Sequence, residues 1–242
     1  MHLVILGDGP LGRAVADAAI ARGDRATIRG RPADGDRHPP AAFLDAEVII
    51  DASRGPAVAA NLDDALRGGC RSVVVAATGW IDDVERLDRR LHDAGAAAVC
   101  AANFSLGAAL FGRLVSAGAA LFGAVDAFEP FLVEWHRRGK ADRPSGTALE
   151  LVRRLTAHHP ARRDHSSIET VSIRAGASPG MHLVGFDDPG ETVELRLTAR
   201  DRSAYAAGIL ASADWLVRTH PAPGRHPFDV VVDDLLREPL AA

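Results

Sequence analysis

The stretch from residue 134 to residue 148 concentrates side chains that can carry out chemistry. It reads Glu-Trp-His-Arg-Arg-Gly-Lys-Ala-Asp-Arg-Pro-Ser-Gly-Thr-Ala. His136 titrates near neutral pH and can act as a general acid or base. Lys140 is a compact, titratable cation and the only lysine among 28 lysine and arginine residues. In a chain that otherwise uses arginine, a remaining lysine is favoured where lysine chemistry is needed. The alternative is that Lys140 remains by chance.

A helix is predicted to begin at the end of this stretch. Pro144-Ser145-Gly146-Thr147 is typical of a helix start, and Thr147-x-x-Glu150 fits a capping box. The free N–H groups of such a helix start, next to Lys140, predict a site for a carboxylate or a phosphate. Taken alone, His136 is better explained as a hydrogen-bonded structural histidine. Its closeness to Lys140 and to the helix start favours a functional role.

A second motif lies at the start of the chain. Gly7-Asp8-Gly9-Pro10-Leu11-Gly12 is a G-x-G-x-x-G run that follows an apolar strand, His2–Leu6, and opens a helix over 11–22. The glycines allow a tight turn and a close approach of the backbone to a pyrophosphate. We therefore expect a dinucleotide to bind at this loop. The alternative is a glycine turn without a ligand.

The end of the second predicted strand selects the cofactor. An acidic residue there binds the ribose hydroxyl of NAD, whereas an arginine accommodates the 2′-phosphate of NADP. The sequence reads Thr27-Ile28-Arg29-Gly30-Arg31, without an acid. NADP(H) is favoured and NAD(H) is possible. The alternative is that Arg29 and Arg31 are solvated loop charges.

Strands and helices alternate over the first hundred residues. The strands expected there are apolar throughout, which indicates a parallel sheet covered on both faces. The fold class is therefore α/β, with an N-terminal Rossmann-type parallel sheet. The expected strands are 2–6, 26–28, 48–52, 73–77 and 97–101, and the expected helices are 11–22, 57–67 and 81–94.

The pattern changes after residue 103. A long apolar helix over 106–122 precedes strands over 128–134, 168–174, 181–186 and 192–198, with a helix near 148–155 and a last helix over 203–218. The strand at 192–198 alternates apolar and polar residues, which is typical of a sheet with one solvated face. We expect a second, α+β domain with a mixed sheet.

Composition excludes several classes of protein. A formal net charge of −4 gives no basic footprint for nucleic acid. The apolar runs are shorter than the ~20 residues of a membrane span, and no signal peptide opens the chain, so we expect a cytoplasmic protein that contacts no membrane. Cys70 and Cys100 form neither a disulfide framework nor a metal-binding spacing, so no metal is expected.

The stretch at 134–148 resembles the E-x-H-H-x-x-K-x-D-x-P-S-G-T-A signature of the dihydrodipicolinate reductases, and the resemblance extends over nearly the whole chain. The segment 102–107, Ala-Asn-Phe-Ser-Leu-Gly, is close to the family's domain-junction motif. Further matches are 48–53, Thr78-Gly79, Arg174-Ala175-Gly176, Gly180-Met181-His182, Arg202, Phe228-Asp229 as part of the C-terminal strand, and 233–236.

The resemblance implies an enzyme in which NAD(P)H delivers hydride to a cyclic, unsaturated imino dicarboxylate in lysine and diaminopimelate synthesis. It implies a dinucleotide-binding domain over 1–104 and 203–242, and a domain over 105–202 that binds substrate and builds a homotetramer, with a homodimer as the alternative. His136 is implied as the acid/base residue and Lys140 as the cationic donor. The implied substrate-binding residues are Arg137, Ser145, Gly146 and Thr147. The implied cofactor-binding residues are Gly7, Gly9, Pro10, Leu11, Gly12, Arg29, Ala52, Ser53, Thr78, Gly79, Ala102, Asn103, Phe104 and Arg202.

The sequence departs from the family pattern at several of these positions. The second histidine of the signature is Arg137, the Gly-Thr-Thr-Gly loop begins Ala76-Ala77, and the acid before His182 is Met181. The Thr-His and Ser-Arg pairs of the second domain are replaced at 196–197 and at Asp201. Two alternatives therefore stay open: an imine reductase for another cyclic imino acid in a specialised pathway, and a non-catalytic NADP(H)-binding regulator. A semialdehyde dehydrogenase needs a thiolate nucleophile, for which neither cysteine is well placed.

Overall fold

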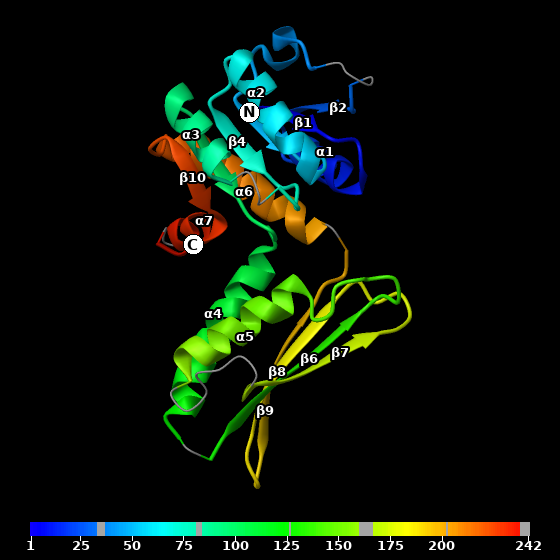
Figure 1. Cartoon of the computed structure of the whole chain (residues 1–242), viewed down its shortest axis with the longest axis vertical. Helices are drawn as coiled ribbons and strands as arrows, with labels where there is room; N and C mark the ends of the chain where they lie inside the picture. The colour runs from blue at the N-terminus through cyan, green and yellow to red at the C-terminus, as the bar shows by residue number, and fades with distance from the viewer. Residues whose placement is uncertain (33–36, 81–83, 126, 160–166, 202, 238–242) are drawn as a thin grey trace. The chain divides into compact units, whose positions relative to one another are not determined.

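The computed structural model describes the chain except for residues 33–36, 81–83, 126, 160–166, 202 and 238–242 (Figure 1). The chain divides into two compact units. The first unit comprises Met1–Leu106 and Arg202–Ala242, and the second comprises Gly107–Asp201. We describe each unit by itself.

The first unit is built on a six-stranded parallel sheet with the order β10-β5-β4-β3-β1-β2. This confirms the predicted Rossmann-type α/β fold. The strands are β1 (His2–Leu6), β2 (Arg25–Arg29), β3 (Val48–Asp51), β4 (Ser72–Val75), β5 (Ala97–Cys100) and β10 (Gly224–Pro227). The helices are α1 (Pro10–Ala21), α2 (Val58–Arg67), α3 (Val84–Ala94), α6 (Ser203–Thr219) and α7 (Phe228–Arg237), with short 3-10 turns at Pro40–Phe43 and Gly55–Ala57.

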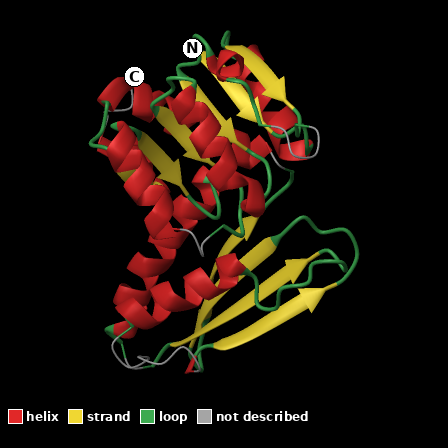
Figure 2. Cartoon of the chain, turned by 45° about the horizontal axis from the view of Figure 1, so that its top comes forward, coloured by secondary structure: helices red, strands yellow, loops and turns green. Residues whose placement is uncertain are grey.

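The apolar strands of this unit are buried because helices cover the sheet on both faces (Figure 2). Helices α2 and α3 contribute Leu62 and Leu87 to a core shared with Leu6, Ile49 and Val73 of the sheet. Helices α1 and α6 pack against each other, and α6 also contacts β3, β4 and β5. The C-terminal strand predicted at 228–229 was placed too late, because the strand ends at residue 227 and α7 begins at residue 228.

The second unit contains a four-stranded mixed sheet with the order β7-β6-β8-β9, which confirms the predicted mixed sheet. Strand β6 runs parallel to β7 and antiparallel to β8, and β8 runs antiparallel to β9. The elements are α4 (Leu106–Gly123), β6 (Glu129–His136), α5 (Gly146–His158), β7 (Glu169–Arg174), β8 (Met181–Asp187) and β9 (Thr192–Thr198).

Helices α4 and α5 cover one face of this mixed sheet. Phe111 of α4 and Leu155 of α5 belong to one core with Leu132, Val184 and Phe186 of the sheet. By length and hydropathy alone, α4 is the one helix in the described part of the chain that qualifies as a membrane span. Its buried side chains take part in this core, which accounts for its apolar composition.

Candidate active site

The register of β6, β7 and β8 builds a polar cluster at one end of the helix-covered face of the mixed sheet. Glu134 of β6 lies between Ser172 of β7 and His182 of β8. His136 lies beside Arg174 of β7. Side chains on a strand alternate between faces, so these residues continue the row that elsewhere holds the apolar core. This face of the sheet is therefore apolar where the helices cover it and polar at the end that carries Glu134 and His136.

Glu134 is the centre of this cluster and is fully buried. Its Oε1 atom accepts hydrogen bonds from the Ser145 backbone N–H (3.0 Å), the Ser172 hydroxyl (2.5 Å) and the Arg174 guanidinium (2.7 Å). Burial by itself raises the pKa of a carboxyl group, but these donors outweigh it and lower the pKa of Glu134 to about 2. The site therefore holds a fixed carboxylate at neutral pH.

Two buried histidines face the second oxygen of this carboxylate. Nε2 of His136 is 3.1 Å from Oε2 of Glu134, and Nε2 of His182 is 3.7 Å from the same atom. The two imidazole rings meet edge to face, with centroids 5.1 Å apart. Burial lowers the pKa of His136, and it lowers the pKa of His182 to about 4.

Helix α5 begins beside this cluster at Ser145. The Ser145 hydroxyl accepts a hydrogen bond from the Ala148 N–H (3.1 Å) and lies 3.2 Å from Nε2 of His182. The capping box predicted at Thr147 is therefore wrong, because Ser145 already caps the helix and Thr147 lies inside its first turn. Glu150 instead pairs with arginines of the same helix.

Lys140 lies in the loop that leads from β6 to α5. Its ammonium group donates to both carboxylate oxygens of Asp142, at 2.6 and 2.8 Å. The Lys140 ammonium lowers the pKa of Asp142, and the Gly146 backbone, which faces the same carboxylate, adds to this effect. The carboxylate that Lys140 holds therefore belongs to the chain itself.

Several residues of the cluster were not among the predicted site residues. They are Glu134, Asp142, Arg174 and His182. Arg174 joins two of them, since it donates to the Glu134 carboxylate and to the Asp142 backbone carbonyl (2.5 Å). For Glu134, Arg174 and His182 the available signal was a titratable residue inside each of three strands. The strand register that brings them together cannot be predicted from any one segment.

Arg137 takes the position of the second histidine in the family signature. It is exposed, unlike its buried neighbour His136. Lys140 is partly buried, and Ser145 is buried. The predicted substrate-binding residues thus occupy one continuous loop and helix start.

The glycine loop of the first unit links β1 to α1 through a tight turn. Gly7 has a φ of +114°, and a Cβ there would lie 2.7 Å from the Ala52 carbonyl oxygen. A Cβ on Gly12 would lie 2.0 Å from the Gly7 carbonyl oxygen. A Cβ on Gly9 would meet no atom within 4 Å among the described residues. The fold therefore requires glycine at residues 7 and 12. At Gly9 there is room for a ligand to approach the start of α1, where Pro10 and Leu11 are the first two residues.

Other predicted cofactor-binding residues follow the carboxyl ends of neighbouring strands. Gly7 donates its N–H to the Arg29 carbonyl at the end of β2 (2.8 Å). Parallel strands end at the same edge of a sheet, and ligands of open α/β sheets bind there. The residues that follow β3, β4 and β5 include Ala52, Ser53, Thr78, Gly79, Ala102, Asn103 and Phe104. Arg202 lies outside the described residues.

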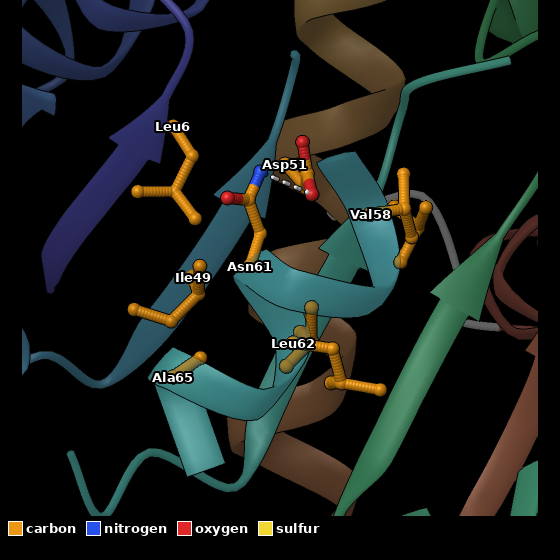
Figure 3. Close-up of a pocket in the computed structure, with 9 residues that line it drawn as sticks. Leu6, Ile49, Asp51, Val58, Asn61, Leu62 and Ala65 are labelled. Carbon is orange, nitrogen blue, oxygen red and sulfur yellow. Dashed lines mark hydrogen bonds between the residues drawn. The ribbon is translucent and has the colours of Figure 1, made fainter. Parts of the chain in front are cut away.

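Asp51 and Asn61 form a buried polar contact below this edge. The Asn61 side-chain amide donates to the Asp51 carboxylate (3.0 Å) (Figure 3). The same carboxylate also accepts from the Ser53 backbone N–H (3.0 Å) and hydroxyl (2.5 Å). Burial raises the pKa of Asp51. The narrow gap around this contact is otherwise lined by apolar side chains, including Leu6, Ile49 and Val58. It belongs to the core of the first unit, and the contact fixes the loop that carries Ser53.

The cysteines have no nucleophilic environment. Both are free, Cys70 is buried, and burial raises the pKa of the Cys100 thiol to about 12. Burial also raises the pKa of Cys70. Because the thiolate is the nucleophile, these environments disfavour thiol catalysis.

Comparisons with known proteins agree with this architecture. The family model for the C-terminal part of dihydrodipicolinate reductase matches residues 107–228. The 4-hydroxy-tetrahydrodipicolinate reductase of Archaeoglobus fulgidus is 32% identical over 200 residues, which cover 77% of this chain and 76% of that protein. The enzyme of the same name from Rhodopirellula baltica is 32% identical over 202 residues, with coverages of 76% and 71%.

Solved structures show the same fold. A dipicolinate-bound dihydrodipicolinate reductase from Paenisporosarcina sp. TG-14 superimposes with a TM-score of 0.74 at 16% identity, covering 94% of this chain and 97% of that one. GenD2 from gentamicin A biosynthesis, solved with NAD, has a TM-score of 0.59 at 12% identity, with coverages of 96% and 90%. The structures show the fold, and the relatives found by sequence show the family. The chain belongs to the dihydrodipicolinate reductase family of nicotinamide-dependent oxidoreductases.

Proposed function

We propose that this enzyme reduces a cyclic, unsaturated imino dicarboxylate of the dihydrodipicolinate type with NADPH. The observation that carries the proposal is the pairing of Asp142 with Lys140 at the start of α5, where the Gly146 backbone faces the same carboxylate. A group of donors that holds the chain's own carboxylate can hold a substrate carboxylate in the same way. The similar dicarboxylate-binding enzyme from Paenisporosarcina supports this substrate class.

The roles proposed for the residues follow from their chemistry. The reduced nicotinamide supplies hydride, which leaves negative charge on the substrate. Lys140 stabilises that charge as a positioned ammonium group, and His136 transfers the accompanying proton. Gly146 and Thr147 bind a substrate carboxylate through backbone and hydroxyl donors, and Ser145, whose N–H already donates to Glu134, contributes its hydroxyl. The exposed Arg137 adds a cation beside them.

The cofactor site is proposed on the first unit, in a dinucleotide-binding domain over 1–104 and 203–242. The start of α1 offers N–H groups without a capping side chain, which suits a pyrophosphate. Arg29 ends β2 with an exposed side chain and is the proposed partner of a 2′-phosphate. We therefore favour NADP(H) over NAD(H).

The domain over 105–202 is proposed to bind substrate and to form a homotetramer. A homodimer is the alternative. The face of its sheet away from α4 and α5 carries apolar side chains, and Trp135, Val171 and Ile173 are 38%, 45% and 40% exposed. Adjacent strands pair Trp135 with Ile173 and Val133 with Val171, so these residues form one patch. A contiguous apolar patch of this kind marks an interaction surface.

Calorimetric titration tests the proposed ligands. The protein is titrated with NADPH, with NADH and with pyridine-2,6-dicarboxylate, a stable analogue of the ring. We expect tighter binding of NADPH than of NADH, and saturable binding of the dicarboxylate. Binding of a cofactor without binding of the dicarboxylate would contradict the proposed substrate.

An imine reductase for a different cyclic imino acid is the second candidate. The observation that favours it is the exposed arginine at residue 137, where the family signature has a histidine. This enzyme would bind NADPH but turn over a related imino acid faster than dihydrodipicolinate. A non-catalytic regulator would bind NADPH and turn over neither compound.

A further inference from the structure

The neighbourhood of Glu134 contains two proton acceptors that face each other. Oε2 of Glu134 and Nε2 of His136 are 3.1 Å apart and buried, and neither has a hydrogen-bond partner among the described residues. Oε1 of the same carboxylate is held by three donors, so the carboxylate cannot turn freely. An ionised carboxylate only accepts hydrogen bonds, so any proton shared between these two atoms must lie on the histidine.

The other nitrogen of His136 also faces an acceptor. The backbone of Pro179 faces His136 and raises the pKa of the ring. Proline has no N–H group, so only its carbonyl can receive an imidazole N–H there. A Cβ on Gly180 would lie 3.2 Å from Nδ1 of His136, which places that nitrogen on the Pro179–Gly180 side of the ring. A neutral imidazole has one N–H for two acceptors, whereas an imidazolium satisfies both.

We infer that Glu134 is a positioning residue that receives the second N–H of His136, so that the imidazole takes up a proton in place. The step is the transfer of one proton from a hydronium ion to a ring nitrogen, so an N–H bond forms as an O–H bond of the hydronium ion breaks and water is released. This inference rests on the proposed role of His136 in proton transfer. In this role Glu134 stabilises the protonated ring of His136, which burial destabilises.

The charges around His136 favour a proton over a metal ion at this point. Glu134, His136 and His182 place three potential ligand atoms within 4.8 Å of one another. Arg174 already neutralises Glu134, and His182 and Lys140 add no negative charge. A divalent cation would leave two uncompensated positive charges in a buried cluster, whereas a proton leaves one. The test below therefore includes a measurement of metal binding.

The direction of the pH effect follows from the same groups. Burial lowers the pKa of His136, the Glu134 carboxylate opposes that effect, and Lys140 and Arg174 reinforce it. Glu134→Gln removes the opposing charge. An opposite charge at this distance shifts a pKa by about 1–3 units, so the protonation of His136 should move to lower pH by at least about one unit.

The test measures the titration of His136 directly. The full-length protein is labelled with ¹⁵N-histidine, and the imidazole resonances are followed against pH by NMR, with His136 assigned from His136→Asn. Ser172→Ala is the matched control, because it removes one donor from Oε1 and leaves Oε2 in place. Thermal unfolding of each variant shows that the proteins compared are folded.

We expect the His136 midpoint to fall by about one unit or more in Glu134→Gln and by less than about 0.3 units in Ser172→Ala. Equal shifts in the two variants, or no shift in either, would overturn the inference. Stoichiometric binding of Zn²⁺ by calorimetry, lost in Glu134→Gln, would overturn it in favour of a metal site. The titration needs no turnover, so it is independent of enzyme activity. If the His136 midpoint shifts in Glu134→Gln but the parent protein has no reductase activity, the proposed function is contradicted and the role of Glu134 toward His136 is still supported.

Discussion

At the residue scale, the carboxylate of Asp142 occupies donors that the proposed substrate needs. It pairs with the Lys140 ammonium and faces the Gly146 backbone, and the side chain of Asp142 is 52% exposed. An exposed carboxylate of this kind is held weakly, since such ion pairs contribute about 0.2–1 kcal/mol. A substrate carboxylate can therefore displace it at small cost.

Asp142→Asn should strengthen the binding of pyridine-2,6-dicarboxylate. The substitution removes a competing anion and leaves Lys140 charged, so the dissociation constant should fall by about two- to fivefold. Calorimetry measures the change. Asp188→Asn, in the turn between β8 and β9, is the matched control and should bind like the parent. Weaker binding in Asp142→Asn would mean that Asp142 positions Lys140 instead of competing with substrate.

His182 predicts how stability depends on pH. Its pKa is about 4 in the folded protein, against an ordinary value of 6.5, because burial disfavours the charged ring. The unfolded chain binds the proton more tightly, so stability falls as the pH drops from about 6.5 to 4, by about 3 kcal/mol in all. Thermal unfolding of His182→Gln should show less of this loss. His158→Gln, an exposed histidine of α5, should lose stability like the parent, and the prediction fails if both variants do.

At the element scale, the strands and helices of the first hundred residues follow from local sequence, whereas β10 and α7 do not. Apolar runs between glycine and proline turns predicted the central parallel strands, because strands covered on both faces bury nearly every side chain. The polar cluster was only partly predictable. His136, Lys140 and Ser145 lie in one segment, whereas Arg174 and His182 reach it through strand register. Register depends on pairing between distant segments, which periodicity does not reveal.

The glycine loop gives a prediction that separates folding from binding. Gly12→Ala should destabilise the protein, because its Cβ would lie 2.0 Å from the Gly7 carbonyl oxygen. Gly9→Ala should fold normally, since no described atom lies within 4 Å of its Cβ, but should bind NADPH at least about tenfold more weakly. Thermal unfolding and calorimetry measure the two effects. Unchanged NADPH affinity in a folded Gly9→Ala protein would contradict a pyrophosphate at this loop.

At the scale of the whole molecule, the apolar patch of the mixed sheet predicts self-association. Val171→Glu combined with Ile173→Glu places charges in the patch and should reduce the mass measured by light scattering after size exclusion. Leu121→Glu on α4 is the matched control, because Leu121 is 71% exposed and lies outside the patch. We expect it to keep the parent mass. A parent protein that is monomeric at micromolar concentration would rule out the proposed assembly.

We propose that this member of the family reduces a dihydrodipicolinate-type substrate by means of Lys140. The most direct measurement follows NADPH oxidation with enzymatically generated dihydrodipicolinate, for the parent, Lys140→Ala and Arg138→Ala. Loss of a positioned charge or proton donor typically lowers the rate by about 10²–10⁴-fold, so we expect that loss in Lys140→Ala. The exposed Arg138 serves as control and should leave turnover near the parent value. No oxidation above background in a parent protein that binds NADPH, or equal turnover in Lys140→Ala, would contradict the claim.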